Sequence, residues 1–501
     1  MSISKKILVL LLALAVVCLP VLAACGGEEE SSVAPDTSKT SEDPSDVSVG
    51  PEDIIPDIID TNQREINVYC ANWNTDSIIA FTGEIIYSTE EGEATAIDTQ
   101  KKAVVDWVEE NYNCYIDGVR ETSGGYVNTV RNMVETGVYT YDILFHGLNT
   151  LASLAVNDYL EDLNGIPTLQ LGNSWWDQHS VEDLSIANHL YMVCGDINTF
   201  DNIGTWVLLF NKKLKDDMKI DDDFYALARN RQWTLDKLAE ICKGHTYEQN
   251  EPAGLDEGDI WAMGSENYNI YVTSIAAGLK IVEKDDDDIP HLTVENHKSE
   301  VFSALQKVVD FYTAGDVHLG NDPKYQAKYG DKCFNQTVFK AFKEGRQLFY
   351  ECGLLHVASF REMDDPFGIL PIPMTFEGQD DYHTTVSTGN ASFMAIPKGV
   401  PNLEELGTVI EAIAMKSKEL VTPEFYDIQL KYRDTRDSES AEMLDIIFST
   451  RSFDVGATYN WGGILGLYTK LDSDFASRFD ANLDAIKAAM EETVETFRLR
   501  E

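Results

Sequence analysis

Basic residues are scarce in this sequence of 501 residues. It contains 39 Lys and Arg against 85 Asp and Glu, which gives a formal net charge of −46. Nucleic acids and anionic lipid surfaces are bound mainly through Lys and Arg, which displace the counterions of the phosphates. The composition therefore argues against nucleic acid as a partner. With 44% hydrophobic residues, the chain still has enough apolar material for large buried cores.

Sequence patterns of familiar catalytic and metal sites are also missing. The chain has no GxSxG, HExxH, GxxxxGK[ST] or CxxC pattern, and no GxGxxG follows an expected strand. The aspartate runs at 221–223 and 285–288 lack the alternating ligands and the glycine of a calcium-binding EF-hand loop. We therefore expect no catalytic residue, no metal site and no cofactor, and we do not expect an enzyme.

A long apolar run stands near the start of the chain. Lys5 and Lys6 precede apolar residues 7–24, and the run ends in Leu-Ala-Ala-Cys at 22–25. A basic start, an apolar core and small residues at the end are typical of a secretory signal peptide, the alternative being a transmembrane helix. The Leu-Ala-Ala-Cys ending resembles a bacterial lipobox. We expect residues 1–24 to be removed and Cys25 to carry lipid such as palmitate, which anchors the protein on the outer face of the cytoplasmic membrane.

The segment after Cys25 differs in composition from the rest of the chain. Residues 25–60 contain 11 acidic residues and one lysine, with many Ser, Thr and Pro. Such a segment cannot bury enough apolar surface to fold by itself, so we predict a disordered acidic tether over 25–61. The remaining six cysteines are scattered, mostly within apolar runs, and we expect them to be buried free thiols: Cys70, Cys114, Cys194, Cys242, Cys333 and Cys352.

From residue 64 onward, short apolar runs alternate with stretches of helical periodicity. Strands are predicted at 66–70, 114–116, 141–145, 190–193 and 206–210. Amphipathic helices are predicted at 104–112 and 127–134, and again at 235–242 after Thr234 and at 301–312 before Gly315. This alternation predicts an α/β fold with mostly parallel sheets flanked by helices.

Five short motifs in a fixed order support a more specific interpretation. They are YDIL at 141–144 with YLEDL at 159–163, YMV at 191–193 with LLFNKKL at 208–214, WTLDKL at 233–238, FKEGRQL at 342–348, and GILPIP at 368–373. Their order resembles that of the family 1 extracellular solute-binding proteins, the receptors of ABC importers. The resemblance implies a two-lobed, type II periplasmic-binding-protein-like fold, a ligand cleft between the lobes, and permease transmembrane subunits as partners of a monomer. We expect one lobe from 62–202 plus 353–398, and the other from 203–352 plus 399–501.

Candidate ligand-binding residues are polar or aromatic and lie after expected strands or near expected crossings between the lobes. Aromatic faces stack on the C–H surfaces of sugars, whereas amides and carboxylates hydrogen-bond to their hydroxyl groups. The candidates are Trp73, Asn74, His146, Trp176, Asp201, Tyr268, Glu351, Asn390 and Trp461.

The sequence thus predicts an extracytoplasmic receptor that closes on a small solute, most simply a mono- or oligosaccharide, and delivers it to an ABC permease. Two alternatives remain open. A lipid-anchored glycan hydrolase would need two carboxyl groups about 5–9 Å apart in one cleft. A surface adhesin would bind no small solute by closure.

Overall fold

The computed structural model describes residues 53–71, 84–89, 95–121, 124–249, 254–360, 363–425 and 438–500. The predicted signal peptide, Cys25 and most of the predicted tether lie outside these residues. Within the described part of the chain, no helix combines the length and the apolar composition needed to cross a membrane. All six cysteines that follow Cys25 are buried and unpaired, as predicted.

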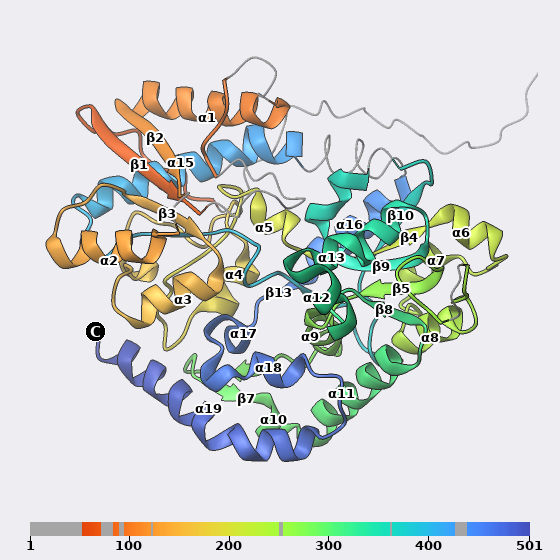
Figure 1. Ribbon diagram of the computed structural model, residues 1–501. Coiled ribbons are helices and arrows are strands. Elements are labelled where there is room, and N and C mark those ends of the chain that lie inside the picture. Colours follow the sequence, from red (N-terminus) through yellow and green to blue (C-terminus); the bar gives the residue numbers. More distant parts are fainter. Residues whose placement is uncertain are drawn as a thin grey trace, which may run out of the picture. The chain divides into compact units, whose positions relative to one another are not determined.

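The first sheet has four strands in the order β12-β3-β1-β2. The strands are β1 (Arg64–Cys70), β2 (Cys114–Arg120), β3 (Ile143–His146) and β12 (Phe393–Ala395). β1 pairs in parallel with β2 and β3, whereas β12 is antiparallel to β3. Helices α1 (Ala96–Tyr112) and α2 (Tyr126–Thr136) connect the parallel strands, so these βαβ units confirm the predicted α/β fold (Figure 1).

The second sheet has five strands in the order β10-β4-β9-β5-β8. They are β4 (Trp206–Asn211), β5 (Trp261–Ser265), β8 (Val317–Leu319), β9 (Gln347–Gly353) and β10 (Phe367–Leu370). β5 is parallel to β8 and β9, but β4 is antiparallel to both β9 and β10. The prediction of a mostly parallel sheet is therefore wrong for the second sheet, because β4 runs opposite to both of its neighbours.

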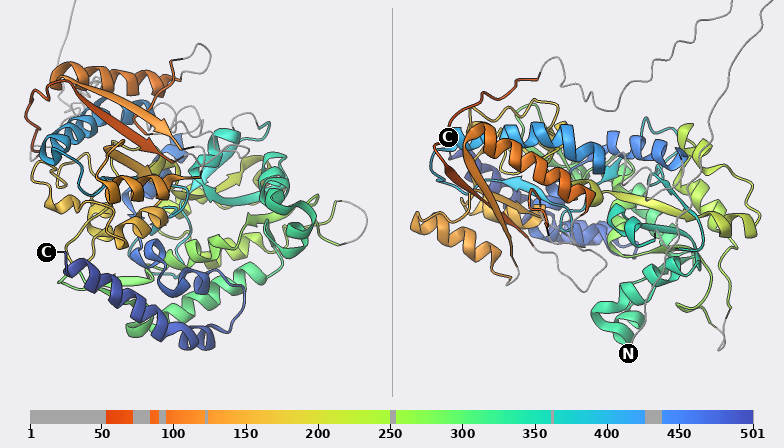
Figure 2. Two further views of the ribbon diagram at one scale, coloured as in Figure 1. Left: turned by 60° about the vertical axis from the view of Figure 1, so that its left-hand side comes forward. Right: turned by 90° about the horizontal axis from the view of Figure 1, so that it is seen from above.

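Two segments lie elsewhere than the expected lobe boundaries place them. Residues 353–398 were expected with the first sheet, but β10 pairs with β4 in the second. Residues 399–501 were expected with the second sheet, but α15 (Leu403–Thr422) packs along α1 beside the first (Figure 2). Each of the two helices has a buried apolar face. Packing of these faces against each other holds α15 beside the first sheet.

Helices fill most of the remaining chain. Thr234 caps α8 (Leu235–Cys242) through its hydroxyl, as the sequence predicts. Also as predicted, α11 (Lys298–Thr313) ends just before Gly315, which has a positive φ of 93°.

The predicted strand at 190–193 does not form beyond an isolated bridge at Val193. The other helices are α3 (Leu148–Val156), α4 (Gln178–Leu184), α5 (Phe200–Ile203), α6 (Lys212–Asp217), α7 (Phe224–Arg229), α8 (Leu235–Cys242), α9 (Tyr268–Ile275), α10 (Thr293–Asn296), α11 (Lys298–Thr313), α12 (Pro323–Tyr329), α13 (Cys333–Gln336), α14 (Val338–Lys343), α16 (Ser438–Ser449), α17 (Val455–Tyr459), α18 (Leu465–Tyr468) and α19 (Phe475–Arg498).

Short strand pairs and the last residues connect distant parts of the chain. β6 (Val282–Lys284) pairs with β7 (Pro290–Leu292), and β11 (Thr384–Thr385) pairs with β13 (Arg451–Ser452). After α19, the Arg500 guanidinium donates hydrogen bonds to the carbonyl oxygens of Ala155 and Val156, at 2.7 and 2.9 Å. These are carbonyls of the last turn of α3, so the end of the chain is held against an element that precedes the second sheet.

A buried carboxylate holds α15 against the loop before α4. Each oxygen of Glu411 accepts two hydrogen bonds: Oε1 from the Trp176 indole and the Gln170 N–H at 2.7 and 2.8 Å, and Oε2 from the Trp175 indole and the Asn173 amide at 2.6 and 3.1 Å. Four donors replace the water that the carboxylate loses on burial. This cluster also explains why Trp176 is buried, at 2% exposure.

The first prediction concerns this cluster. Glu411→Gln replaces one oxygen by an NH₂ group, which faces two donors and can accept from neither. We expect the free energy of unfolding to fall by about 3 kcal/mol, because buried donors lose their partner. Urea denaturation measures this loss. Glu404→Gln, at an exposed position on the same helix, is the control and should change stability by less than about 0.5 kcal/mol. Equal effects of the two changes would contradict the role of the cluster.

Candidate functional site

Three strands of the second sheet bring their ends to one edge. β4 begins at Trp206 directly opposite Gly353, the last residue of β9, because the two strands are antiparallel. β5 runs parallel to β9, so its carboxyl end, followed by Glu266, reaches the same edge. Ligands of open α/β sheets bind outside the carboxyl ends of strands, so this edge is where a site is expected.

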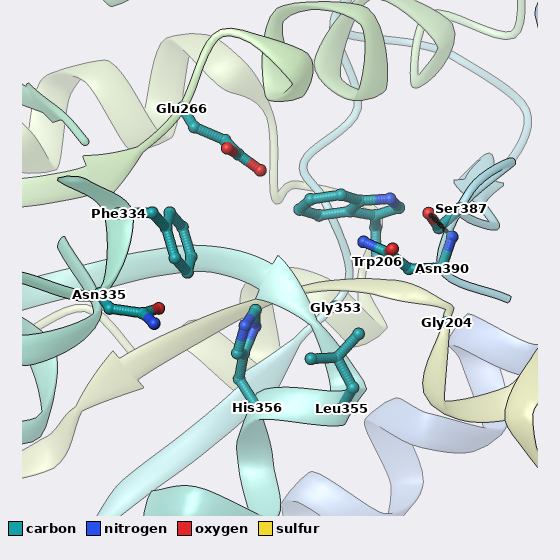
Figure 3. A pocket seen from close by; sticks show the side chains of 10 residues that line it. All are labelled: Gly204, Trp206, Glu266, Phe334, Asn335, Gly353, Leu355, His356, Ser387 and Asn390. Carbon is teal, nitrogen blue, oxygen red and sulfur yellow. Dashed lines mark hydrogen bonds between the residues drawn. The ribbon is translucent and has the colours of Figure 1, made fainter. Parts of the chain in front are cut away.

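A cavity of about 220 Å³ lies at this edge. Its lining comes from segments far apart in the sequence: the start of β4, the residue after β5, α13, the end of β9 with the turn after it, and the loop before β12. The lining residues, drawn in Figure 3, are Gly204, Trp206, Glu266, Phe334, Asn335, Gly353, Leu355, His356, Ser387 and Asn390.

The Trp206 indole forms the apolar centre of the lining. It lies between Glu266 on one side and Ser387 and Asn390 on the other (Figure 3). Its ring stacks on that of Tyr268, with centroids 5.5 Å apart and an angle of 27° between the planes. Only 7% of the residue is exposed. Tyr268 therefore fixes the orientation of an aromatic face at the cavity.

The loop that contains Ser387 and Asn390 lies beside the crossing into β4. The Ser387 N–H donates to the Gly204 carbonyl at 2.9 Å, and the Asn390 N–H donates to the Ser387 hydroxyl at 3.0 Å. A Cβ atom on Gly204 would come within 2.5 Å of the Ala391 Cβ, so this close approach requires glycine. The loop leads into β12 of the first sheet, and the cavity is therefore lined from both sheets.

Glu266 and His356 are the ionisable side chains of the lining. Burial shifts the pKa values of both toward the neutral form. Burial raises the pKa of the Glu266 carboxyl from 4.5 to about 7. It lowers the pKa of the His356 imidazole to about 3, so this histidine is neutral at physiological pH. Among the described residues, no group donates a hydrogen bond or an ion pair to the Glu266 carboxylate. In Figure 3 that carboxylate points toward the space between Trp206 and Phe334.

Two predicted site residues lie at or next to this cavity. Asn390 is part of the lining, and the Tyr268 ring stacks on the ring of Trp206. Trp73 and Asn74 lie outside the described residues. His146, at the end of β3, is not in the lining. Its ring meets that of Tyr126 edge-on at 4.5 Å, and burial lowers its pKa to about 4.

The remaining candidates have partners inside the protein and do not line the cavity. Trp176 belongs to the Glu411 cluster. Trp461 stacks on Tyr459 at 5.3 Å and donates from its indole to the Thr493 hydroxyl at 2.8 Å.

Two acidic candidates are also held by the protein itself. The Glu351 carboxylate accepts hydrogen bonds from the hydroxyls of Ser265 and Thr273, both at 2.9 Å, and burial raises its pKa to about 7. Asp201 pairs with the Arg451 guanidinium at 3.0 Å. Each of these carboxylates stabilises the packing around the crossing between the sheets.

Most of the lining residues are not among the predicted candidates. Trp206 is the first residue of the predicted strand 206–210 and also the first residue of β4, and it was treated as part of that strand. Glu266 directly follows a strand, which is the criterion that selected other candidates. Phe334, Asn335 and Leu355 carry no local signal, because only tertiary packing brings α13 and the turn after β9 to the cavity. No cluster of three metal-ligating side chains occurs in the described part of the chain.

The family model described as bacterial extracellular solute-binding protein matches residues 63–409. That range contains all ten lining residues. No protein with a curated description matches the chain in sequence.

Solved structures share the fold at low sequence identity. A cyclo/maltodextrin-binding protein in complex with maltotetraose has a TM-score of 0.52 and 13% identity, over 87% of this chain and 97% of its own. A sugar transporter from Rhizobium etli, in an open conformation, also has a TM-score of 0.52, with 12% identity over 86% of this chain and 99% of its own. An ABC substrate-binding protein from Listeria monocytogenes, in complex with cycloalternan, has a TM-score of 0.50 and 12% identity, over 87% of this chain and 99% of its own.

The raised pKa of Glu266 predicts a pH-dependent difference in stability. The folded protein keeps a proton that the unfolded chain releases near pH 4.5, so this contribution to stability is present below about pH 4.5 and is lost as the pH rises to about 7. We expect the melting temperature of Glu266→Gln, minus that of the wild type, to increase between pH 5 and 8. Other buried acids are common to both proteins and cancel in the difference. A difference that stays constant with pH would contradict the shift.

Proposed function

Because the chain belongs to the bacterial extracellular solute-binding proteins, we propose that it captures a mono- or oligosaccharide outside the cytoplasm and delivers it to the permease of an ABC transporter. The observation that carries this proposal is the cavity around Trp206, where the chain crosses between the two sheets. A solute bound at that crossing contacts residues next to both sheets, so its binding depends on how the two sheets are placed relative to each other.

The lining has the chemistry that saccharides require. Trp206 and Phe334 supply aromatic surface for sugar C–H groups, and Asn335, Ser387 and Asn390 supply amide and hydroxyl groups for hydrogen bonds. The structural neighbours bound to maltotetraose and cycloalternan support this solute class. A glycan hydrolase is disfavoured, because it would need two carboxyl groups at the cleft and the lining contains only that of Glu266.

Closure of the two lobes is the proposed means of capture. Glu266 follows a strand of the second sheet, whereas Asn390 precedes a strand of the first. A solute that touches both gains contacts only when the lobes approach each other. It therefore favours the closed arrangement by the free energy of those contacts. The cavity of about 220 Å³ is smaller than the roughly 300–1,000 Å³ typical of ligand pockets, so an oligosaccharide would extend beyond it.

In this proposal, the first sixty residues hold the receptor at the cell surface. Cys25 carries lipid after removal of residues 1–24, and the acidic tether over 25–61 separates the folded part from the membrane. The receptor acts as a monomer, performs no catalysis and presents its solute to the transmembrane subunits of the permease. The membrane contact rests on Cys25, since the net charge of −46 disfavours adsorption to anionic lipid.

Calorimetric titration with maltooligosaccharides and other neutral and amino saccharides tests capture. For a saccharide that binds, Trp206→Ala should weaken the affinity at least tenfold, because about 1.4 kcal/mol of stacking is lost. Trp107→Ala, on the partly exposed side of α1 and outside the cavity, should leave the affinity unchanged. Circular dichroism of both variants confirms folding. Absence of binding by every saccharide would reject the proposed solute class.

Fractionation of a bacterial host tests the anchor. Wild-type protein should be recovered with the membranes, and Cys25→Ser should be recovered outside them, because a hydroxyl cannot accept the thioether-linked lipid. Cys70→Ser, which changes a buried cysteine of β1, is the matched control and should stay with the membranes. Recovery of all three proteins in the same fraction would contradict lipidation of Cys25.

A further inference from the structure

Among the described residues, the partly buried Glu266 carboxylate differs from the buried ones in having no hydrogen-bond or ion-pair partner. Glu351 and Glu411 accept hydrogen bonds from hydroxyl, indole and amide groups, and Glu84 accepts them from the backbone and hydroxyl of Thr199 and from the Phe200 N–H. Asp201 pairs with Arg451. A ligand that fills the cavity would remove this carboxylate from water, which is costly unless the ligand itself supplies a partner. Of these carboxylates, Glu266 is also the one that lines the cavity.

Among the residues that the structure describes, the groups that face Glu266 supply no positive charge. His356 stays neutral, because burial lowers its pKa to about 3. Burial raises the pKa of Tyr268 to about 12 and raises those of Tyr350 and Cys352, so all three stay protonated and neutral. Glu351, on the neighbouring strand β9, is an acid and cannot compensate the charge of Glu266.

The surroundings of the carboxylate are those of a cation site. Figure 3 shows the Glu266 carboxylate above the space that the Trp206 and Phe334 rings border. Aromatic faces attract ammonium groups, and the attraction grows when the cation is desolvated. A divalent metal ion does not fit as well, because it needs several oxygen ligands and the lining offers one carboxylate.

We propose that the solute carries a protonated amine, which binds in the cavity between the Glu266 carboxylate and the aromatic face of Trp206. This inference rests on the proposed function and specifies the solute of the same site. The amine supplies the positive charge that the described residues around Glu266 do not. A neutral saccharide would donate hydrogen bonds from its hydroxyl groups to the carboxylate but would supply no positive charge. Two kinds of solute share this chemistry, an amino saccharide and an aliphatic polyamine.

Four probes separate these possibilities by calorimetric titration at pH 7: a glucosamine tetramer, its N-acetylated counterpart, maltotetraose and spermidine. We expect an amine probe to bind at least tenfold more tightly than the neutral saccharides. Glu266→Gln should remove that preference. Glu377→Gln, an exposed position outside the cavity, changes the net charge equally and should retain the preference. The melting curves recorded for the pH-dependent stability difference show independently whether Glu266→Gln is folded.

The pH dependence of binding provides a second readout. The primary amines of spermidine, like that of lysine, are protonated at both pH 6 and pH 8, because the pKa of such an amine is about 10. Binding requires ionised Glu266, whose pKa is about 7 in the empty site. The fraction ionised, and with it the association constant, should rise about tenfold from pH 6 to 8. In Glu266→Gln this rise should disappear.

The outcomes distinguish this inference from the proposed function. A preference for the glucosamine tetramer supports both, and a preference for spermidine alone supports the amine and rejects the saccharide. Binding of maltotetraose or the N-acetylated tetramer, equal in wild type and Glu266→Gln and without binding of the amines, overturns the amine and leaves the receptor function standing. Absence of binding by all four probes overturns both.

Discussion

The antiparallel register of β4 and β9 is the constraint on which the site depends. It sets Trp206 opposite Gly353 and so fixes where the chain enters the second sheet relative to where β9 leaves it. The parallel pairing of β5 with β9 then brings Glu266 to the same edge. A slip of one residue in either ladder would turn these side chains to the opposite face of the sheet. Backbone hydrogen bonds within one sheet thus position an aromatic ring and a carboxylate that are 60 residues apart in the sequence.

Two carboxylates of the protein differ in how their oxygens are satisfied. Glu411 stabilises the packing between α15 and the tryptophan pair, and the chain provides donors for both of its oxygens. Glu266 faces the cavity, and the described residues provide no donor for it. Loss of hydration is compensated in the first case by the protein and in the second only by a ligand, and this difference separates a packing role from a binding role.

The sequence predicted the fold better than the site, for physical reasons. Helical periodicity, a Thr234 cap and a glycine stop are local signals, and α8 and α11 form as expected. The α/β alternation is local as well, and the family match supports it. The direction of β4 and the return of α15 to α1 depend on contacts between distant segments, so the periodicity could not reveal them.

Site residues were harder to predict because residue type does not show whether a side chain is already satisfied. Trp176, Trp461 and Glu351 have the chemistry of ligand contacts, yet their polar atoms are bound within the protein. The partner of Trp176 lies 235 residues further along the chain. Asn390, which lines the cavity, is a candidate because it belongs to a polar turn before a strand, and its role in binding stays a prediction. Glu266 lines the same cavity and follows a strand, so a position criterion of this kind would also select it.

The strand order of the first sheet has a consequence for how the chain folds during synthesis. β12 joins β3 only when residue 395 has been made, and Arg500 contacts the carbonyl oxygens of α3 across sequence separations of 345 and 344 residues. For most of its synthesis the nascent chain exposes the apolar edge of β3 and the face of α1 that α15 later covers. Contacts of such long sequence separation make folding slow, and unpaired strand edges are prone to aggregation. A growing chain of this topology therefore leaves these surfaces uncovered until β12 and α15 have been made.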